Sequence, residues 1–194
     1  LLLIAAVMCI ILGMGMPTLG VYVLLAVIVA PSLVEVGIEP LAAHMFILYF
    51  GMMSLITPPV AVAAFFAASI AEAPAMATGW TSMRFGWTAY VVPFLFVFSP
   101  SLLLQGNAAD FVVDVGSAIG GVWLLSAGMI GYFTRPMTWT GRMAFLGAGT
   151  LLLIPAELAS WAAWTDWIGL ALGVAVVAWE LGARRRSQGA SAAP

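Results

Sequence analysis

The stretch "SLITPPVAV", residues 54–62, places two adjacent prolines inside a long apolar run. A proline has no backbone N–H, and its ring clashes with the carbonyl four residues earlier, so Pro58 and Pro59 should end any α-helix that contains them. The apolar run 41–71 is therefore predicted to be a broken helix, with one half on each side of Thr57-Pro58-Pro59.

Composition decides the class of protein in which this break lies. Of the 194 residues, 64% are hydrophobic and 7% are charged, whereas roughly 25% of the residues of a soluble domain are charged. We therefore expect an all-α, polytopic membrane protein. The formal net charge is −2, which offers no basic surface for nucleic acid. Cys9 is the only cysteine and cannot form a disulfide within the chain.

Several other stretches are long enough to cross a bilayer, which takes about 20 apolar residues. Residues 1–34 are also apolar but are interrupted by "GMGMPT" (13–18), which leaves pieces shorter than a spanning helix, so we expect a re-entrant hairpin there. The stretch "TGWTSMRFGW" (78–87) mixes aromatic residues with Arg84 and should lie along the cytoplasmic membrane interface. The predicted single spans are 86–104, 115–133, 143–163 and 166–183.

The arginines predict the orientation of these spans, because basic residues gather on the cytoplasmic side. With one crossing per predicted span, all six arginines fall on one side and the C-terminus is cytoplasmic. The tail 184–194 contains small and polar residues and is expected to be disordered. The chain begins without an initiator methionine or a signal peptide, so we expect a C-terminal fragment of a longer protein.

The two breaks carry the residues that suggest a function. Broken helices in membranes are tolerated where protein or water surrounds them, and secondary transporters use them as ion and substrate sites. Ser54 and Thr57 share one helical face, and hydroxyl and carbonyl oxygens are the hard ligands that suit an alkali cation. In the first break, Gly13 and Gly15 give backbone freedom, while Pro17 suits the first turn of a new half-helix and Thr18 offers a hydroxyl.

Two structural explanations of the same residues stay open. A proline in a membrane helix can be only a kink whose freed carbonyls are satisfied by Ser or Thr neighbours. The Gly-x-Gly of residues 13–15 can simply permit close packing of helices.

The run from "GMGMPT" (13–18) through "ITPPV" (56–60) to "SLLL" (101–104) resembles the end of the large membrane subunit of tripartite ATP-independent periplasmic (TRAP) transporters. It is most similar to the fused permeases that work with TAXI-type solute-binding proteins. The resemblance covers about residues 1–104 and implies one inverted-repeat half of an elevator-type transporter. Residues 105–183 are then additional C-terminal transmembrane helices.

The resemblance also implies roles for residues at both breaks. It implies a sodium site, with no other cofactor or metal, flanked by Gly13, Gly15, Ser54, Thr57 and the Val60 carbonyl. The helix breaks and the substrate-facing tip would be formed by Pro17, Thr18, Pro58 and Pro59. Members of the family tend to read Gly-x-x-Thr-Pro-Pro-Val-Gly, whereas this chain has Ser54 and Ala61 in place of those glycines.

The function implied is that of a permease in the bacterial inner membrane that imports an organic anion, a carboxylate, by sodium symport. An extracytoplasmic solute-binding protein would deliver the anion, and the first repeat would lie in the missing N-terminal half. The sequence contains no G-x-x-x-x-G-K-[ST] nucleotide-binding motif, which agrees with a secondary transporter.

Two other classes of function were weighed. A scaffold or receptor subunit that does not transport would also be a polytopic membrane protein surrounded by lipid. An intramembrane enzyme would need a buried acid pair, a serine with a base, or a metal cluster. The chain has one histidine, His44, and no acidic pair at membrane depth, which disfavours an enzyme.

Overall fold

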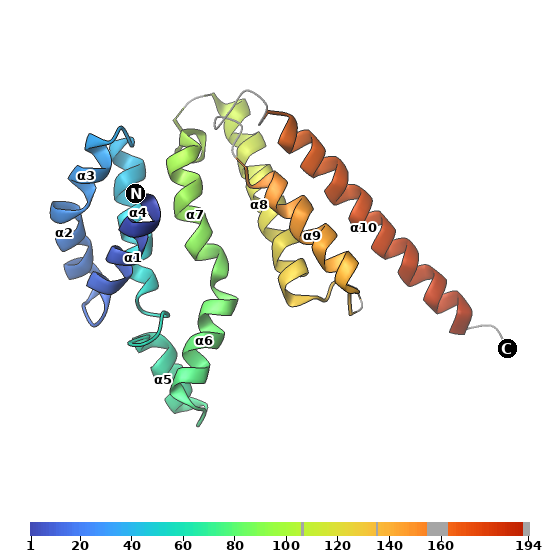
Figure 1. The fold of residues 1–194 in the computed structure, drawn as a ribbon, viewed down its shortest axis with the longest axis horizontal. Coiled ribbons are helices and arrows are strands. Elements are labelled where there is room, and N and C mark those ends of the chain that lie inside the picture. The colour runs from blue at the N-terminus through green and yellow to red at the C-terminus, as the bar shows by residue number, and fades with distance from the viewer. Residues whose placement is uncertain (106, 135, 155–162, 192–194) are drawn as a thin grey trace. The chain divides into compact units, whose positions relative to one another are not determined.

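The computed structural model describes residues 1–105, 107–134, 136–154 and 163–191, and these residues form helices and no strand (Figure 1). The prediction of an all-α protein is therefore confirmed for the described part of the chain. The chain divides into two compact units, Leu1–Leu103 and Leu104–Pro194, and each unit has its own packing.

The first unit contains both predicted breaks. The first break separates α1 from α2, and the second separates α4 from α5. Helices α6 and α7 follow one another end to end, with Gly86 between them (Figure 1). The elements of this unit are α1 (Leu2–Gly13), α2 (Thr18–Ile28), α3 (Ala30–Glu35), α4 (Pro40–Met53), α5 (Val62–Ile70), α6 (Ala75–Phe85), α7 (Trp87–Phe98) and the 3₁₀ helix η1 (Pro100–Leu103).

The first break is a tight turn between two half-helices. Gly15 has φ of +79°, a left-handed conformation that glycine adopts without steric cost. Pro17 is the N-cap of α2, with extended backbone angles, rather than the first helical residue that the sequence suggested. The 11 or 12 residues of each half-helix are fewer than a bilayer span needs.

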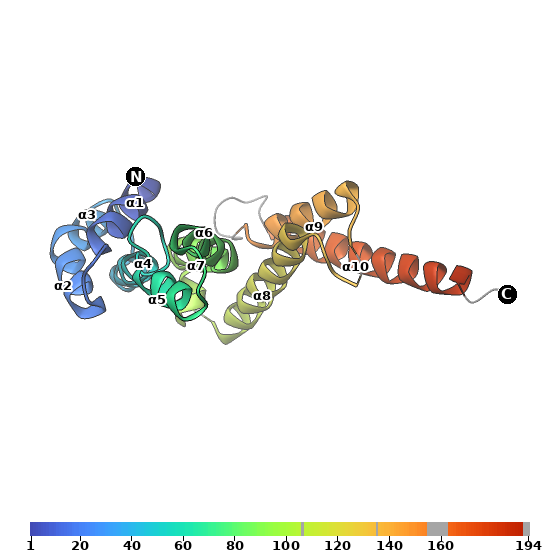
Figure 2. The same cartoon turned by 90° about the horizontal axis from the view of Figure 1, so that it is seen from below.

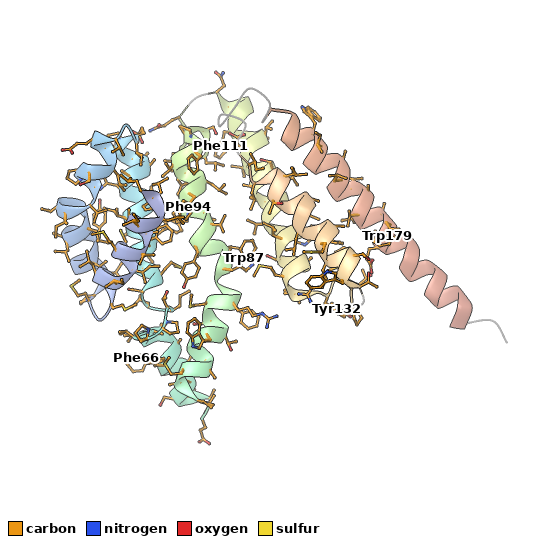
Figure 3. The ribbon with its side chains drawn as sticks, viewed as in Figure 1. Phe66, Trp87, Phe94, Phe111, Tyr132 and Trp179 are labelled. Atoms are coloured by element: carbon orange, nitrogen blue, oxygen red, sulfur yellow. The ribbon has the colours of Figure 1, made fainter. Side chains whose placement is uncertain are left out.

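Helix α4 is the centre of the first unit and packs on α1, α2 and α7. Figures 1 and 2 show it between the α1–α2 hairpin and α7. Phe94 of α7 points toward α4 (Figure 3) and meets the rings of Phe46 and Phe50, both with centroids 5.4 Å away. These edge-on ring contacts hold α4 and α7 together beside the second break.

The second break is followed by two short helices, α5 and α6, with a sharp bend between them. The stretch 78–87, expected along the membrane interface, falls mostly in α6, which packs against α5 after a bend of 118° between the two helix axes. Pro74 precedes the first residue of α6, where a proline is compatible with a helix start. The chain therefore turns back next to the break.

The second unit consists of α8 (Ala108–Ile130), α9 (Trp139–Leu152) and α10 (Ala163–Ser191). Gly121 of α8 and Gly149 of α9 lie against each other: a Cβ on Gly149 would be 2.8 Å from the Gly121 carbonyl oxygen. Small residues of this kind let helix backbones approach closely in membranes. Arg142 joins the same two helices, because its guanidinium donates to the carbonyls of Gly128 (3.1 Å) and Met129 (3.0 Å) at the end of α8.

The helix lengths differ in part from the predicted spans. Among the described residues, Phe111–Ile130 of α8 is long and apolar enough to cross a membrane, and α5 with α6 passes the same test only as a bent pair. The predicted span 86–104 is α7 followed by η1. The predicted span 143–163 begins earlier, at Trp139, and its residues 155–162 lie outside the described part.

The C-terminal end of the chain requires a correction. Residues 184–194 were expected to be a disordered tail, but α10 continues as a helix to Ser191. The arginines and alanines of this stretch are good helix formers, and no proline interrupts it before the last residue. A helix that has already formed in the apolar segment therefore extends at little cost.

Candidate functional site

The hydroxyl of Ser54 joins the two helix breaks. It is directed at the carbonyl oxygens of Gly51 (2.6 Å) and Gly13 (3.0 Å), and Ser54 is 2% exposed. A hydroxyl has a single hydrogen, so it can make only one full hydrogen bond to these two acceptors. The contact to Gly51 is the shorter one and therefore the stronger hydrogen bond, and the Gly13 carbonyl receives only a weak one.

Gly13 is required by this close approach. A Cβ at Gly13 would lie 2.7 Å from the Gly51 carbonyl oxygen and 2.9 Å from Ser54 Oγ. The backbone end of α1 thus rests directly on the last turn of α4. Although Gly13 and Ser54 are 41 residues apart, they form one site.

Thr57 supplies the second buried hydroxyl of the break. Its Oγ1 lies 2.5 Å from the Met53 carbonyl oxygen and 2.6 Å from the hydroxyl of Tyr90, a residue of α7. Pro58 cannot donate to the Ser54 carbonyl four residues earlier, so α4 ends at Met53. Hydroxyl and carbonyl oxygens consequently gather at the end of this helix without a charged group among them.

The remaining residues predicted for the site lie around this pair of breaks in different environments. Val60 is half-buried and Pro58 is buried. A Cβ on Gly79 of α6 would be 3.0 Å from the Pro58 ring, so Pro58 packs on α6. The exposed members of the predicted set are Gly15, Pro17, Thr18 and Pro59. The structure therefore brings Gly13 together with Ser54, and places Thr57 one turn further along.

Ala61 occupies a left-handed backbone conformation at the end of the break. Its φ is 32° and its side chain is fully buried. This conformation favours glycine and penalises side chains by roughly 1–2 kcal/mol. The glycine that the family pattern has here is thus explained by the backbone, and alanine is the smallest side chain that can replace it.

We expect Ala61→Gly to be tolerated and Ala61→Val to be destabilising. Glycine removes the left-handed strain while losing one buried methyl, worth about 0.8 kcal/mol, so the two effects largely cancel. Valine adds a β-branched side chain at positive φ and overpacks a buried position by about 1–3 kcal/mol. Thermal unfolding of the purified protein in detergent measures both variants, and an Ala61→Val protein as stable as the unmutated one would contradict the prediction.

Two functional neighbours of the break were not identified from the sequence. The Ser82 hydroxyl of α6 lies within hydrogen-bond distance of the Ile56 carbonyl (2.9 Å) as well as of the Gly79 carbonyl in its own helix (2.8 Å), and Tyr90 of α7 contacts Thr57. Neither residue belongs to a local motif, and both come from helices whose contact with the break depends on the bend after α5. The one feature of the sequence that could have pointed to these contacts is the spacing of four residues between Ser82, Gly86 and Tyr90.

Comparison with protein families decides the identity of the first unit. Residues 1–110, more than half of the chain, match the family model described as the DctM component of the tripartite ATP-independent periplasmic transporter. The chain belongs to this family. The DctM match contains all of the first unit, including both breaks, and confirms the resemblance to the large TRAP membrane subunit.

Membership of the DctM family has a direct consequence for the class of function. A DctM component is part of a transporter, so the chain is a transporter component and not an enzyme. Comparisons with curated proteins and with solved structures gave no match. The oxygen cluster at the two breaks is accordingly interpreted as part of a permease.

Proposed function

We propose that this chain is part of a TRAP permease that imports an organic anion by sodium symport, and that sodium binds where the two breaks meet. The observation that supports this proposal is the Ser54 hydroxyl, placed between the Gly13 and Gly51 carbonyl oxygens. It connects the tip of the hairpin with the end of a broken helix, the two kinds of element that form ion sites in secondary transporters.

The chemistry of the cluster suits a monovalent cation. Hard cations prefer oxygen ligands, and the C-terminal end of a helix such as α4 carries partial negative charge. The proposed ligands are the Ser54 and Thr57 oxygens with backbone carbonyls of Gly13, Gly15 and Val60. Pro17, Thr18, Pro58 and Pro59 would shape the breaks and the tip that faces the substrate.

The proposal extends to the partners and the membrane. The permease would lie in the bacterial inner membrane with a cytoplasmic C-terminus, and an extracytoplasmic solute-binding protein would deliver a carboxylate to it. The first unit would be the second inverted repeat of an elevator-type transporter whose first repeat lies in the N-terminal half. The family description, a tripartite periplasmic transporter component, supports this arrangement. A scaffold subunit that binds no ion is the alternative function.

Thr57→Ala is expected to weaken sodium binding while leaving both breaks intact. An ion that binds only the folded protein raises its melting temperature according to ion concentration and affinity. We expect the sodium concentration needed to reach a given rise in melting temperature to increase about tenfold, which corresponds to about 1.4 kcal/mol of binding free energy. The measurement is thermal unfolding of the complete permease in sodium chloride and in choline chloride at equal ionic strength.

Thr78→Ala is the matched control for this experiment. Thr78 of α6 also donates to the carbonyl four residues earlier, that of Pro74 (3.0 Å), but it lies outside the oxygen cluster. It should change the melting temperature equally in both salts. If sodium fails to stabilise the unmutated permease, the sodium site is wrong and the scaffold function is favoured.

A further inference from the structure

Three residues of the α6–α7 segment contact the second break. Ser82 lies in α6, Gly86 lies between the two helices and Tyr90 lies in the first turn of α7. We call these three residues the docking strip. The strip faces the break at three consecutive points, and all of them involve Ile56 or Thr57.

The contacts of the docking strip show how closely the break is held. Ser82 Oγ is directed at two carbonyl oxygens, that of Gly79 in its own helix (2.8 Å) and that of Ile56 in the break (2.9 Å), which share its single hydrogen. At Gly86 the Ile56 side chain fills the place of a side chain, because a Cβ there would lie 2.8 Å from Ile56 Cδ1. The Tyr90 hydroxyl then lies 2.6 Å from Thr57 Oγ1. The strip thus holds the backbone, the apolar side chain and the hydroxyl of adjacent break residues.

Counting hydrogens assigns the direction of the Tyr90 contact. The Thr57 hydroxyl has one hydrogen and two acceptor lone pairs, and the Met53 carbonyl at 2.5 Å can only accept. The Thr57 hydrogen is therefore used on Met53, so Tyr90 must be the donor to Thr57. The Thr57 hydrogen then points at the Met53 carbonyl, one lone pair of Oγ1 accepts from Tyr90, and the second lone pair is not used by either contact.

We propose that Tyr90 is a positioning residue of the ion site, which orients the Thr57 oxygen as a cation ligand without itself touching the ion. This inference rests on the proposed function, since it concerns the same sodium site. Thr57 lies in the break between α4 and α5, and its side chain can occupy more than one staggered rotamer, so the contact with Met53 alone does not fix the position of the oxygen. The Tyr90 hydroxyl, fixed by the packing of α7 on α4, keeps the oxygen in one place.

Tyr90→Phe tests this inference, because it removes only the donor and keeps the ring. Groups that orient metal ligands typically change metal affinity by 10–100-fold when they are mutated. We expect the sodium concentration needed to reach a given rise in the melting temperature of the complete permease to increase about tenfold. The melting temperature in choline chloride reports any loss of fold stability separately.

Two comparisons separate positioning from structural support. Tyr49→Phe is the matched control, since Tyr49 of α4 packs its ring on Phe96 at 5.6 Å; it should leave the sodium dependence unchanged. In a Thr57→Val background, Tyr90→Phe should have no further effect on sodium dependence, because the oxygen that it orients is gone. An additional tenfold loss in that background would overturn the inference.

The remaining outcomes distinguish this inference from the proposed function. Sodium stabilisation of the unmutated permease with an unchanged dependence on sodium concentration in Tyr90→Phe would overturn the role of Tyr90 and leave the sodium site standing. Absence of sodium stabilisation in the unmutated permease would overturn both.

Discussion

Gly13→Ala is expected to destabilise the permease by about 2 kcal/mol and to remove most of its stabilisation by sodium. The added Cβ would lie 2.7 Å from the Gly51 carbonyl oxygen and 2.9 Å from Ser54 Oγ. Because the first of these atoms belongs to the backbone of α4, the end of α1 must move away, and such overpacking costs roughly 1–3 kcal/mol. The movement also separates the Gly13 carbonyl from the Ser54 hydroxyl, so two proposed ligands no longer meet.

Gly20→Ala is the control for this prediction. Gly20 lies in α2 of the same hairpin, is exposed, and has open space where a Cβ would be. Alanine there should be neutral or stabilise the helix by roughly 0.5–1 kcal/mol. Thermal unfolding of both variants in sodium and in choline chloride makes the comparison, and a Gly13→Ala protein that keeps its full sodium response would contradict the proposed meeting of the breaks.

Gly149→Ala is expected to cause a comparable loss of stability in the second unit. A Cβ at Gly149 would be 2.7 Å from Leu125 Cγ and 2.8 Å from both the Gly121 carbonyl oxygen and the Leu125 backbone nitrogen. Two of these three atoms are backbone, so α8 and α9 must separate as rigid bodies. We expect a loss of about 2–3 kcal/mol, since helix association in membranes depends on such close packing.

Gly147→Ala provides the comparison two residues earlier on the same helix. Gly147 is exposed and has open space around it, so alanine should have no unfavourable effect there. Both variants are measured by thermal unfolding of the permease in detergent, in the absence of sodium so that the ion site does not contribute. Equal melting temperatures for the two variants would show that the contact between α8 and α9 does not limit stability.

The candidate site was only partly predictable. The two breaks were expected from local chemistry, and the family resemblance implied that the second break faces the tip formed by residues 13–18. The direct contact between Gly13 and Ser54 was not predicted. Tyr90 was missed because nothing near residue 90 reports on Thr57, which is 33 residues earlier. The bend that packs α6 on α5 was not predicted, because Trp80 and Arg84 are typical of a segment at a membrane interface and do not report on such a bend.

The sequence by itself determined the class of the protein and the positions of both helix breaks. These properties depend on composition and on local covalent chemistry: apolar residues favour lipid, and Pro58 and Pro59 lack the N–H that a helix needs. Which oxygens meet at the breaks was decided by the tertiary structure. The packing of α7 on α4 brings Tyr90 to Thr57, and the missing side chain of Gly13 lets α1 reach Ser54, because contacts between distant segments depend on how whole helices fit together.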